Sequence, residues 1–234
     1  MRIIKAHNSS SAWISASKTI LEEGTKRSGL IEILNLVIEI EPKKRSVSQK
    51  DFDQKFRMVF GDERIDFAQS VTFVRPKYKG WHSTEMIWRT NDDTASWNKT
   101  MWGRLIKWNG HFNQIEHAIK RLKKGNDSKT ICAIVFDPLT DGKRNMGTPC
   151  LLSLDFKPRD GKLFMNAFFR SQAISKAGYA DFTALVEMQK FLCKESGLEK
   201  GTITNIATSA HIRSMNNEKK NTLKLLELLK GKSK

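Results

Sequence analysis

The spacing of apolar and polar residues predicts a chain in which helices and strands alternate. Apolar residues that recur every three or four positions predict amphipathic helices, and short runs rich in β-branched residues predict strands. The helical pattern covers 11–23, 49–60, 111–124, 179–196 and 216–230. Strands are expected at 30–40, 129–136, 162–169 and 202–212. With 234 residues and no repeat or clear linker, one domain spanning 1–234 is expected.

Glycine and proline mark the predicted turns. The segment Pro158–Gly161 is expected to reverse the chain, because proline presets φ and glycine tolerates the positive φ that closes a turn. Lys26–Gly29 is expected to be a short basic turn before the strand at 30–40. The helix at 111–124 is expected to carry Phe112 on its apolar stripe.

Composition narrows the classes of partner. Forty-one basic against 25 acidic residues give a net charge of +16, which suits a protein that handles phosphate monoesters or a nucleic-acid backbone. The basic residues are dispersed and do not interleave with aromatics, so nucleic acid is possible but not favoured. No apolar run approaches a membrane span, and no signal peptide is recognised. Three dispersed cysteines favour a reducing compartment, and we expect the cytoplasm.

One hairpin and one helix start bring four reactive groups together. Pro149–Cys150 opens a strand, and the returning strand delivers Arg170 and Ser171. A helix then begins near Asp181. An ordinary thiol is largely protonated at neutral pH, and Arg170 is well placed to favour the Cys150 thiolate. Taken alone, a cysteine is more often a small core residue, and Cys132 and Cys193 are expected to be buried in this way.

These motifs resemble the catalytic half of thymidylate synthase and of its relative deoxycytidylate hydroxymethylase. Pro-Cys, Asp-Gly-Lys-Leu, Arg-Ser and Ser-Ala-His-Ile follow in the family's order and at its intervals. The resemblance is good over about 111–213, weak over 1–110, and leaves 214–234 as a basic C-terminal helix. It implies an α/β (α+β) fold with a twisted mixed sheet layer under helices, and a homodimer formed through the sheet.

The resemblance also implies the roles of individual residues. Cys150 would add to C6 of a pyrimidine ring, which makes C5 a nucleophile. Trp88 and Trp102 would line the nucleotide and folate cavity, although large aromatics fill cores equally often. Lys129 stands in the segment that supplies phosphate ligands to the partner subunit, where the family has arginine. Phosphate and sugar would be bound by Arg27, Arg170, Ser171 and His211.

Three departures from the family pattern are informative. Asp181 stands where thymidylate synthases have an asparagine that reads uracil and where the hydroxymethylases have aspartate, whose carboxylate accepts from the cytosine amino group. The alternative is that Asp181 caps the helix. Arg213 replaces a tyrosine that binds the sugar, and Ala173 replaces an aspartate that grips the pterin. The family's catalytic glutamate cannot be placed, with Glu85, Asp66 and Asp53 as candidates.

The sequence therefore predicts a folate-dependent C5 transferase that acts on a pyrimidine nucleoside monophosphate. Asp181 favours (deoxy)cytidylate 5-hydroxymethyltransferase with 5,10-methylenetetrahydrofolate as cofactor. Two alternatives stay open: a thymidylate synthase that converts deoxyuridylate, and a non-catalytic nucleotide- or nucleic-acid-binding protein on the same fold. No metal site is expected, since the cysteines match no metal-ligand spacing.

Overall fold

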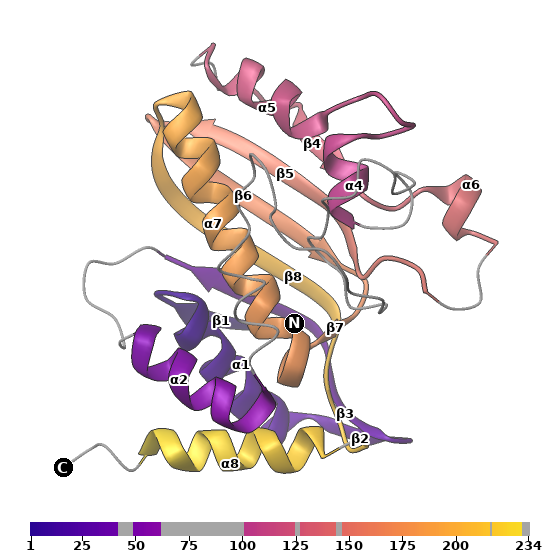
Figure 1. The fold of residues 1–234 in the computed structure, drawn as a ribbon, viewed down its shortest axis with the longest axis vertical. Coiled ribbons are helices and arrows are strands. Elements are labelled where there is room, and N and C mark those ends of the chain that lie inside the picture. The colour runs from indigo at the N-terminus through magenta and orange to yellow at the C-terminus, as the bar shows by residue number, and fades with distance from the viewer. Residues whose placement is uncertain (42–48, 62–100, 125–126, 144–146, 216, 231–234) are drawn as a thin grey trace.

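The computed structural model describes residues 1–41, 49–61, 101–124, 127–143, 147–215 and 217–230. Helices are interspersed with strands along the chain (Figure 1), although some neighbouring elements, such as the strands Leu151–Arg159 and Lys162–Phe169, are of the same kind. Their bounds are β1 (Arg2–Ala6), α1 (Ser9–Glu23), β2 (Thr25–Arg27), β3 (Leu30–Ile40), α2 (Gln49–Phe60), α4 (Met101–Ile106), α5 (Gln114–Leu122), β4 (Ile131–Ile134), α6 (Pro138–Asp141), β5 (Leu151–Arg159), β6 (Lys162–Phe169), β7 (Gln172–Ala173), the π-helix η2 (Ile174–Gly178), α7 (Tyr179–Ser196), β8 (Glu199–Arg213) and α8 (Glu218–Lys230).

A mixed, twisted sheet forms the centre of the described structure. Its strands run in the order β1-β3-β8-β6-β5-β4, with β2 added to β3 and β7 added to β8. The β1–β3 and β6–β8 pairs are parallel, whereas β3–β8 and β5–β6 are antiparallel. Helices α1 and α7 pack against the sheet, and α8 lies beside α2 near the C-terminal end (Figure 1). The predicted α/β class with helices over a twisted mixed sheet is confirmed.

The two faces of the sheet differ in burial because side chains alternate along each strand. One row of paired residues faces the helices and is buried or nearly so: Ile4, Ile38, Asn205, Ala167, Leu154 and Ala133. The neighbouring row points to the other face: Ile3, Val37, Ile206, Phe168, Ser153 and Ile134. In this second row Ile3 is 51%, Phe168 37% and Ile134 42% exposed, so the chain leaves an apolar stripe on the open face.

Two predicted turns are shorter in the structure. Pro158 and Arg159 continue β5, and the reversal to β6 is made by Asp160 and Gly161 alone, whose φ values are 49° and 73°. Two successive residues with positive φ form the hairpin turn whose twist matches that of the strands. Lys26 and Arg27 likewise belong to β2, so the turn before β3 consists of Ser28 and Gly29.

Other expectations were wrong in detail. Phe112 lies before α5, forms a bridge with Trp108 and is 43% exposed, because the helix starts after its Asn113 cap. Cys132 is exposed, since it falls on the outward positions of β4, whereas Cys193 is buried as predicted. The edge strand β1 is too short and too basic to be recognised from its pattern.

Among the described helices, none combines the length and apolar character that a membrane span requires.

Candidate active site

Cys150 and Arg170 lie side by side at one end of the β5–β6 hairpin. The Arg170 amide donates a hydrogen bond to the Cys150 carbonyl at 2.9 Å. Its guanidinium donates to two carbonyls just before the cysteine, that of Pro149 from Nε at 2.8 Å and that of Thr148 from Nη2 at 2.7 Å. Arg170 therefore fixes the backbone that presents the thiol. Its Nη1 makes no hydrogen bond to a described residue, so it can still receive an anion.

A buried polar network brings Asp181 to the same end of the sheet. Asp181, in the first turn of α7, is 1% exposed and accepts a hydrogen bond from Gln172 Nε2 at 3.1 Å. Gln172 is paired in turn with Asn205 of β8, whose Nδ2 donates to Gln172 Oε1 at 2.9 Å. The cap of α7 is Gly178, without a side-chain bond, so the alternative role of Asp181 as the helix cap is wrong.

Charges around Cys150 act in both directions on its pKa. Burial of the thiol raises its pKa, and the negative charge of Asp181 raises it further. The positive charges of Arg170 and Arg213 oppose this and lower the pKa of the thiol. These influences show that Asp181, Arg170 and Arg213 all lie within electrostatic reach of the cysteine. The structure thus brings together four of the residues that the sequence singled out.

His211 occupies a buried position on β8, opposite Glu32 of β3 and Ala173 of β7. It is 7% exposed, and its Nδ1 has no hydrogen-bond partner among the described residues. Burial lowers its pKa, as does the charge of Arg213, whereas the backbone of Ser209 and the carboxylates of Glu218 and Glu32 raise it. A buried ring nitrogen without a partner favours a ligand contact over a purely structural role.

Arg27 and Arg213 lie in one row of the sheet, on either side of Leu30. Adjacent strands are about 4.8 Å apart, so the two Cα atoms are roughly 10 Å apart. Both side chains are exposed, and Arg27 forms an ion pair of 3.9 Å with Glu32. Two guanidinium groups at this spacing can bind one phosphate between them.

Some predicted residues are not near Cys150. Lys129 is exposed and level with Pro158, eight residues along β5 from the cysteine, or roughly 26 Å at 3.3 Å per residue. Ser171, by contrast, directly follows Arg170 at the Cys150 end of the hairpin and is half-buried. Trp88 and the side chain of Trp102 lie outside what the structure describes, as do Glu85 and Asp66.

Asp53, the third candidate for the catalytic acid, belongs to a separate buried cluster. It accepts a hydrogen bond from the Tyr179 hydroxyl, which also contacts Gln49. Burial raises the pKa of Tyr179, and the Asp53 carboxylate adds to this. Tyr179 and Asp181 are two residues apart on α7, and side chains with that spacing point to different sides of a helix. Asp53 therefore joins α2 to α7 on the side away from Asp181.

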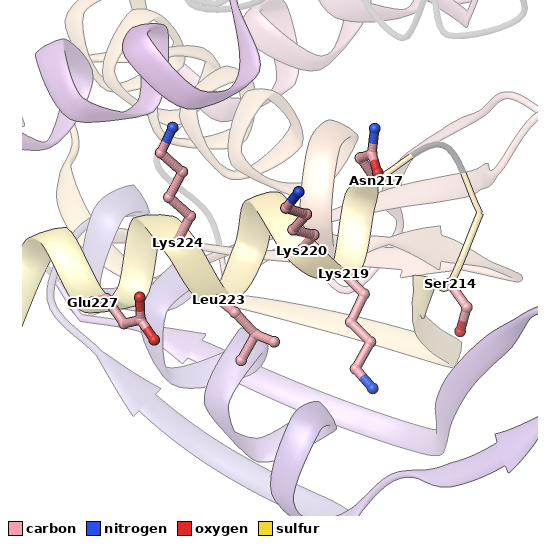
Figure 2. A pocket seen from close by; sticks show the side chains of 7 residues that line it. All are labelled: Ser214, Asn217, Lys219, Lys220, Leu223, Lys224 and Glu227. Carbon is pink, nitrogen blue, oxygen red and sulfur yellow. The ribbon is translucent and has the colours of Figure 1, made fainter.

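A hollow of about 540 Å³ lies beside α8 (Figure 2). It is separate from the residues gathered around Cys150. It is lined by Ser214, Asn217, Lys219, Lys220, Leu223, Lys224 and Glu227. None of these is a predicted site residue, so the site is assigned from the chemistry around Cys150 and not from this hollow. Within the described ranges, no group of acidic, histidine or cysteine side chains is arranged to hold a metal ion.

Sequence reasoning missed Gln172 and Asn205, although a signal for one of them was present. Asn205 lies between Ile203 and Ala207 in the row of buried, otherwise apolar side chains on one face of β8. A polar residue at an inward position needs a partner, because an unpaired buried amide is unfavourable. That partner is Gln172, and it carries the network on to Asp181.

Comparison with known proteins identifies the family to which this mixed sheet and its arrangement around Cys150 belong. A family model described as "Thymidylate synthase" matches residues 69–227, which is more than half of the chain. The chain belongs to the thymidylate synthase family. Its fold and chemistry are therefore those of a folate-dependent enzyme that transfers a one-carbon unit to C5 of pyrimidine nucleotides.

Archaeal relatives cover most of the chain. A protein of Methanosarcina mazei named "Putative thymidylate synthase" is 27% identical over 216 residues, which is 90% of this chain and 89% of the relative. A protein of the same name from Methanocaldococcus jannaschii is 32% identical over 205 residues, 83% of this chain and 78% of the relative.

Proposed function

We propose that the chain transfers a one-carbon unit from 5,10-methylenetetrahydrofolate to C5 of a cytosine nucleoside monophosphate, as a (deoxy)cytidylate 5-hydroxymethyltransferase. The observation that carries the choice of base is the buried carboxylate of Asp181 beside Cys150. Cytosine offers an amino donor at N4, whereas uracil offers a carbonyl acceptor at O4, and a carboxylate accepts but does not donate. Gln172 orients that carboxylate through its amide.

The described residues divide the work on the nucleotide. The Cys150 thiolate adds to C6, so C5 becomes electron-rich and its hydrogen can leave once C5 has formed its new bond. Arg170 holds the cysteine backbone and offers Nη1 to the phosphate, with Ser171 beside it. Arg27 and Arg213, which lie in one row across β2, β3 and β8, bind phosphate. The Nδ1 of His211 forms a hydrogen bond with a sugar hydroxyl.

The fit to the folate is incomplete among the described residues. Methylenetetrahydrofolate is the family's donor and supplies the one-carbon unit when bound. Ala173, where the family resemblance expects an aspartate for the pterin, is half-buried opposite His211, and its methyl group makes no hydrogen bond. The nearby carboxylates of Asp181 and Glu218 accept hydrogen bonds from protein groups. The pterin contact at position 173 is thus missing.

The product tests this proposal. Purified protein is incubated with methylenetetrahydrofolate and either deoxycytidylate, cytidylate or deoxyuridylate, and the nucleotides are analysed by mass spectrometry. A hydroxymethylated cytosine nucleotide supports the proposal. A methylated uracil nucleotide with dihydrofolate, and no product from cytosine, would establish thymidylate synthase instead. The names of the archaeal relatives favour that second candidate.

The reactivity of Cys150 should follow the charges around it. Burial and Asp181 raise the pKa of its thiol, so alkylation by iodoacetamide should reach half its maximum rate at a pH above that of an ordinary thiol. Removing the negative charge in Asp181→Asn should lower this midpoint, and removing the positive charge in Arg213→Gln should raise it. Peptide-resolved mass spectrometry follows Cys150 separately from Cys132 and Cys193. A midpoint that rises in Asp181→Asn, or one that falls in Arg213→Gln, would contradict the assigned geometry.

We further propose a homodimer formed through the open face of the sheet. The apolar stripe through Ile3, Ile206 and Phe168 is favourable to bury, and Lys129 is too far from Cys150 of its own chain to act there. The Lys129 side chain would then serve the site of the partner subunit.

We also propose the cytoplasm as the place of action, because three free cysteines suit a reducing compartment.

Phe168→Glu should therefore convert a dimer into a monomer in light scattering after gel filtration, because the new carboxylate would be buried at the interface. Leu139→Glu is the matched control, since Leu139 is 80% exposed on α6 and should leave the dimer intact. A wild-type chain that is monomeric at micromolar concentration would overturn the proposed interface.

A further inference from the structure

The π-helix η2 connects β7 to α7 and therefore determines where Asp181 lies. π-Helical turns are rare and often occur at functional sites, because one extra residue per turn disturbs the regular hydrogen-bond ladder. Ser175, in this turn, is fully buried. Its carbonyl accepts a hydrogen bond from Trp13 Nε1 at 3.1 Å, and its Oγ donates to Glu218 Oε2 at 2.5 Å. Two distant parts of the chain, α1 and α8, thus hold η2 in place.

Glu218 is an unusual anchor. It is the first residue of α8, is 7% exposed, and forms no ion pair with a described residue. A buried carboxylate loses the solvation that water would give it, so a neutral side chain is normally preferred at such a position. The N-terminus of a helix stabilises a negative charge, and this explains in part why the Glu218 carboxylate is tolerated at the start of α8. It does not explain why the side chain is directed at η2.

The Glu218 carboxylate also acts on His211. The charged groups that act on the pKa of this imidazole are Arg213 on its own strand, Glu32 on β3 and Glu218 on α8, with the backbone of Ser209 as a hydrogen-bond partner. Glu32 is already engaged by Ser209 Oγ and Arg27. Glu218 therefore forms a hydrogen bond to η2, which leads to Asp181, and its charge also acts on His211.

We propose that Glu218 is a positioning residue of the nucleotide site, whose carboxylate holds η2, and with it the start of α7, against α8 and whose negative charge acts on His211. The C-terminal helix is then coupled to the groups that bind base and sugar. This inference rests on the proposed function, since it takes Asp181 and His211 as nucleotide ligands.

The variant Glu218→Gln tests this role. Glutamine keeps the shape and can still accept from Ser175, but it removes the charge. Glu227→Gln is the matched control, because it makes the same change on the exposed side of the same helix. We expect the KM for deoxycytidylate to rise about tenfold with kcat changed less than about threefold in Glu218→Gln only. The pKa of His211, followed by NMR, should fall in this variant, since Glu218 raises it.

Two further results decide the inference. If Glu218→Gln matches the control in KM and in the His211 titration, or only lowers the melting temperature, Glu218 is a helix-start residue and the proposal is wrong. If Glu218→Gln does not fold, Ser175→Ala removes the hydrogen bond between η2 and α8, which Glu218→Gln retains, and should raise KM in the same direction. If wild type neither turns over nor binds nucleotide, the proposed function fails, whereas the His211 titration still decides whether Glu218 acts on the imidazole.

Discussion

Replacing Cys150 by alanine is expected to reduce loss of the C5 hydrogen from the nucleotide by roughly 10³-fold or more, because the thiolate that adds to C6 is removed. Cys150 is half-buried and immediately precedes β5, and the smaller side chain should be accommodated without loss of the fold. Nucleotide binding should persist, since the phosphate and base contacts belong to other residues. The measurement is release of tritium from C5-labelled deoxycytidylate, with binding followed by calorimetry.

Cys132→Ala is the control for this variant, because Cys132 is an exposed thiol on the open face of the sheet. It should retain full activity. Substantial tritium release by the Cys150→Ala protein would exclude Cys150 as the nucleophile. Equal loss in both variants would point to oxidation or assembly as the cause, and would contradict the assigned role as well.

The second large effect is a change of base preference in Asp181→Asn. Asparagine can donate to O4 of uracil, so the variant should lose about 10- to 100-fold in kcat/KM for cytosine nucleotides and gain a similar factor for deoxyuridylate. The side-chain oxygen of asparagine can still accept from Gln172 Nε2, and the buried network can therefore survive the change. Initial rates with both bases measure the ratio.

Asp160→Asn is a suitable control, because Asp160 lies in the exposed β5–β6 turn at a φ of 49° that asparagine adopts readily. Its base preference should equal that of wild type. An unchanged preference in a folded Asp181→Asn protein would show that another residue reads the base. A wild-type enzyme that already prefers deoxyuridylate would show that the Asp181 carboxylate does not select cytosine.

The long, strongly patterned elements could be predicted from the sequence. The bounds of β3, α2 and β6 agree with the expected ranges, because β-branched runs and amphipathic spacing are local signals. The turn at Asp160–Gly161 and the start of α5 were misjudged by two or three residues, since caps and positive-φ residues decide them. The edge strand β1 depends on pairing with β3, which no local pattern reveals.

The candidate site was predictable where it follows from a motif and its register. Cys150, Arg170 and Asp181 were found in this way. The contacts that support them were not, because Gln172–Asn205 and Ser175–Glu218 join residues 33 and 43 positions apart and depend on how η2 and α8 fold back onto the sheet. Arg170 was expected to favour the Cys150 thiolate and to bind phosphate, whereas its hydrogen bonds to the Thr148 and Pro149 carbonyls appeared only in three dimensions.

Tritium release from wild-type protein tests the central claim most directly. C5-tritiated deoxycytidylate, cytidylate and deoxyuridylate are each incubated with the protein, with and without methylenetetrahydrofolate. We predict release from a cytosine nucleotide at a rate well above that from deoxyuridylate, since Asp181 complements cytosine. Release from deoxyuridylate alone would contradict the cytosine assignment, and no release from any of the three by a folded, dimeric protein would contradict the proposed reaction.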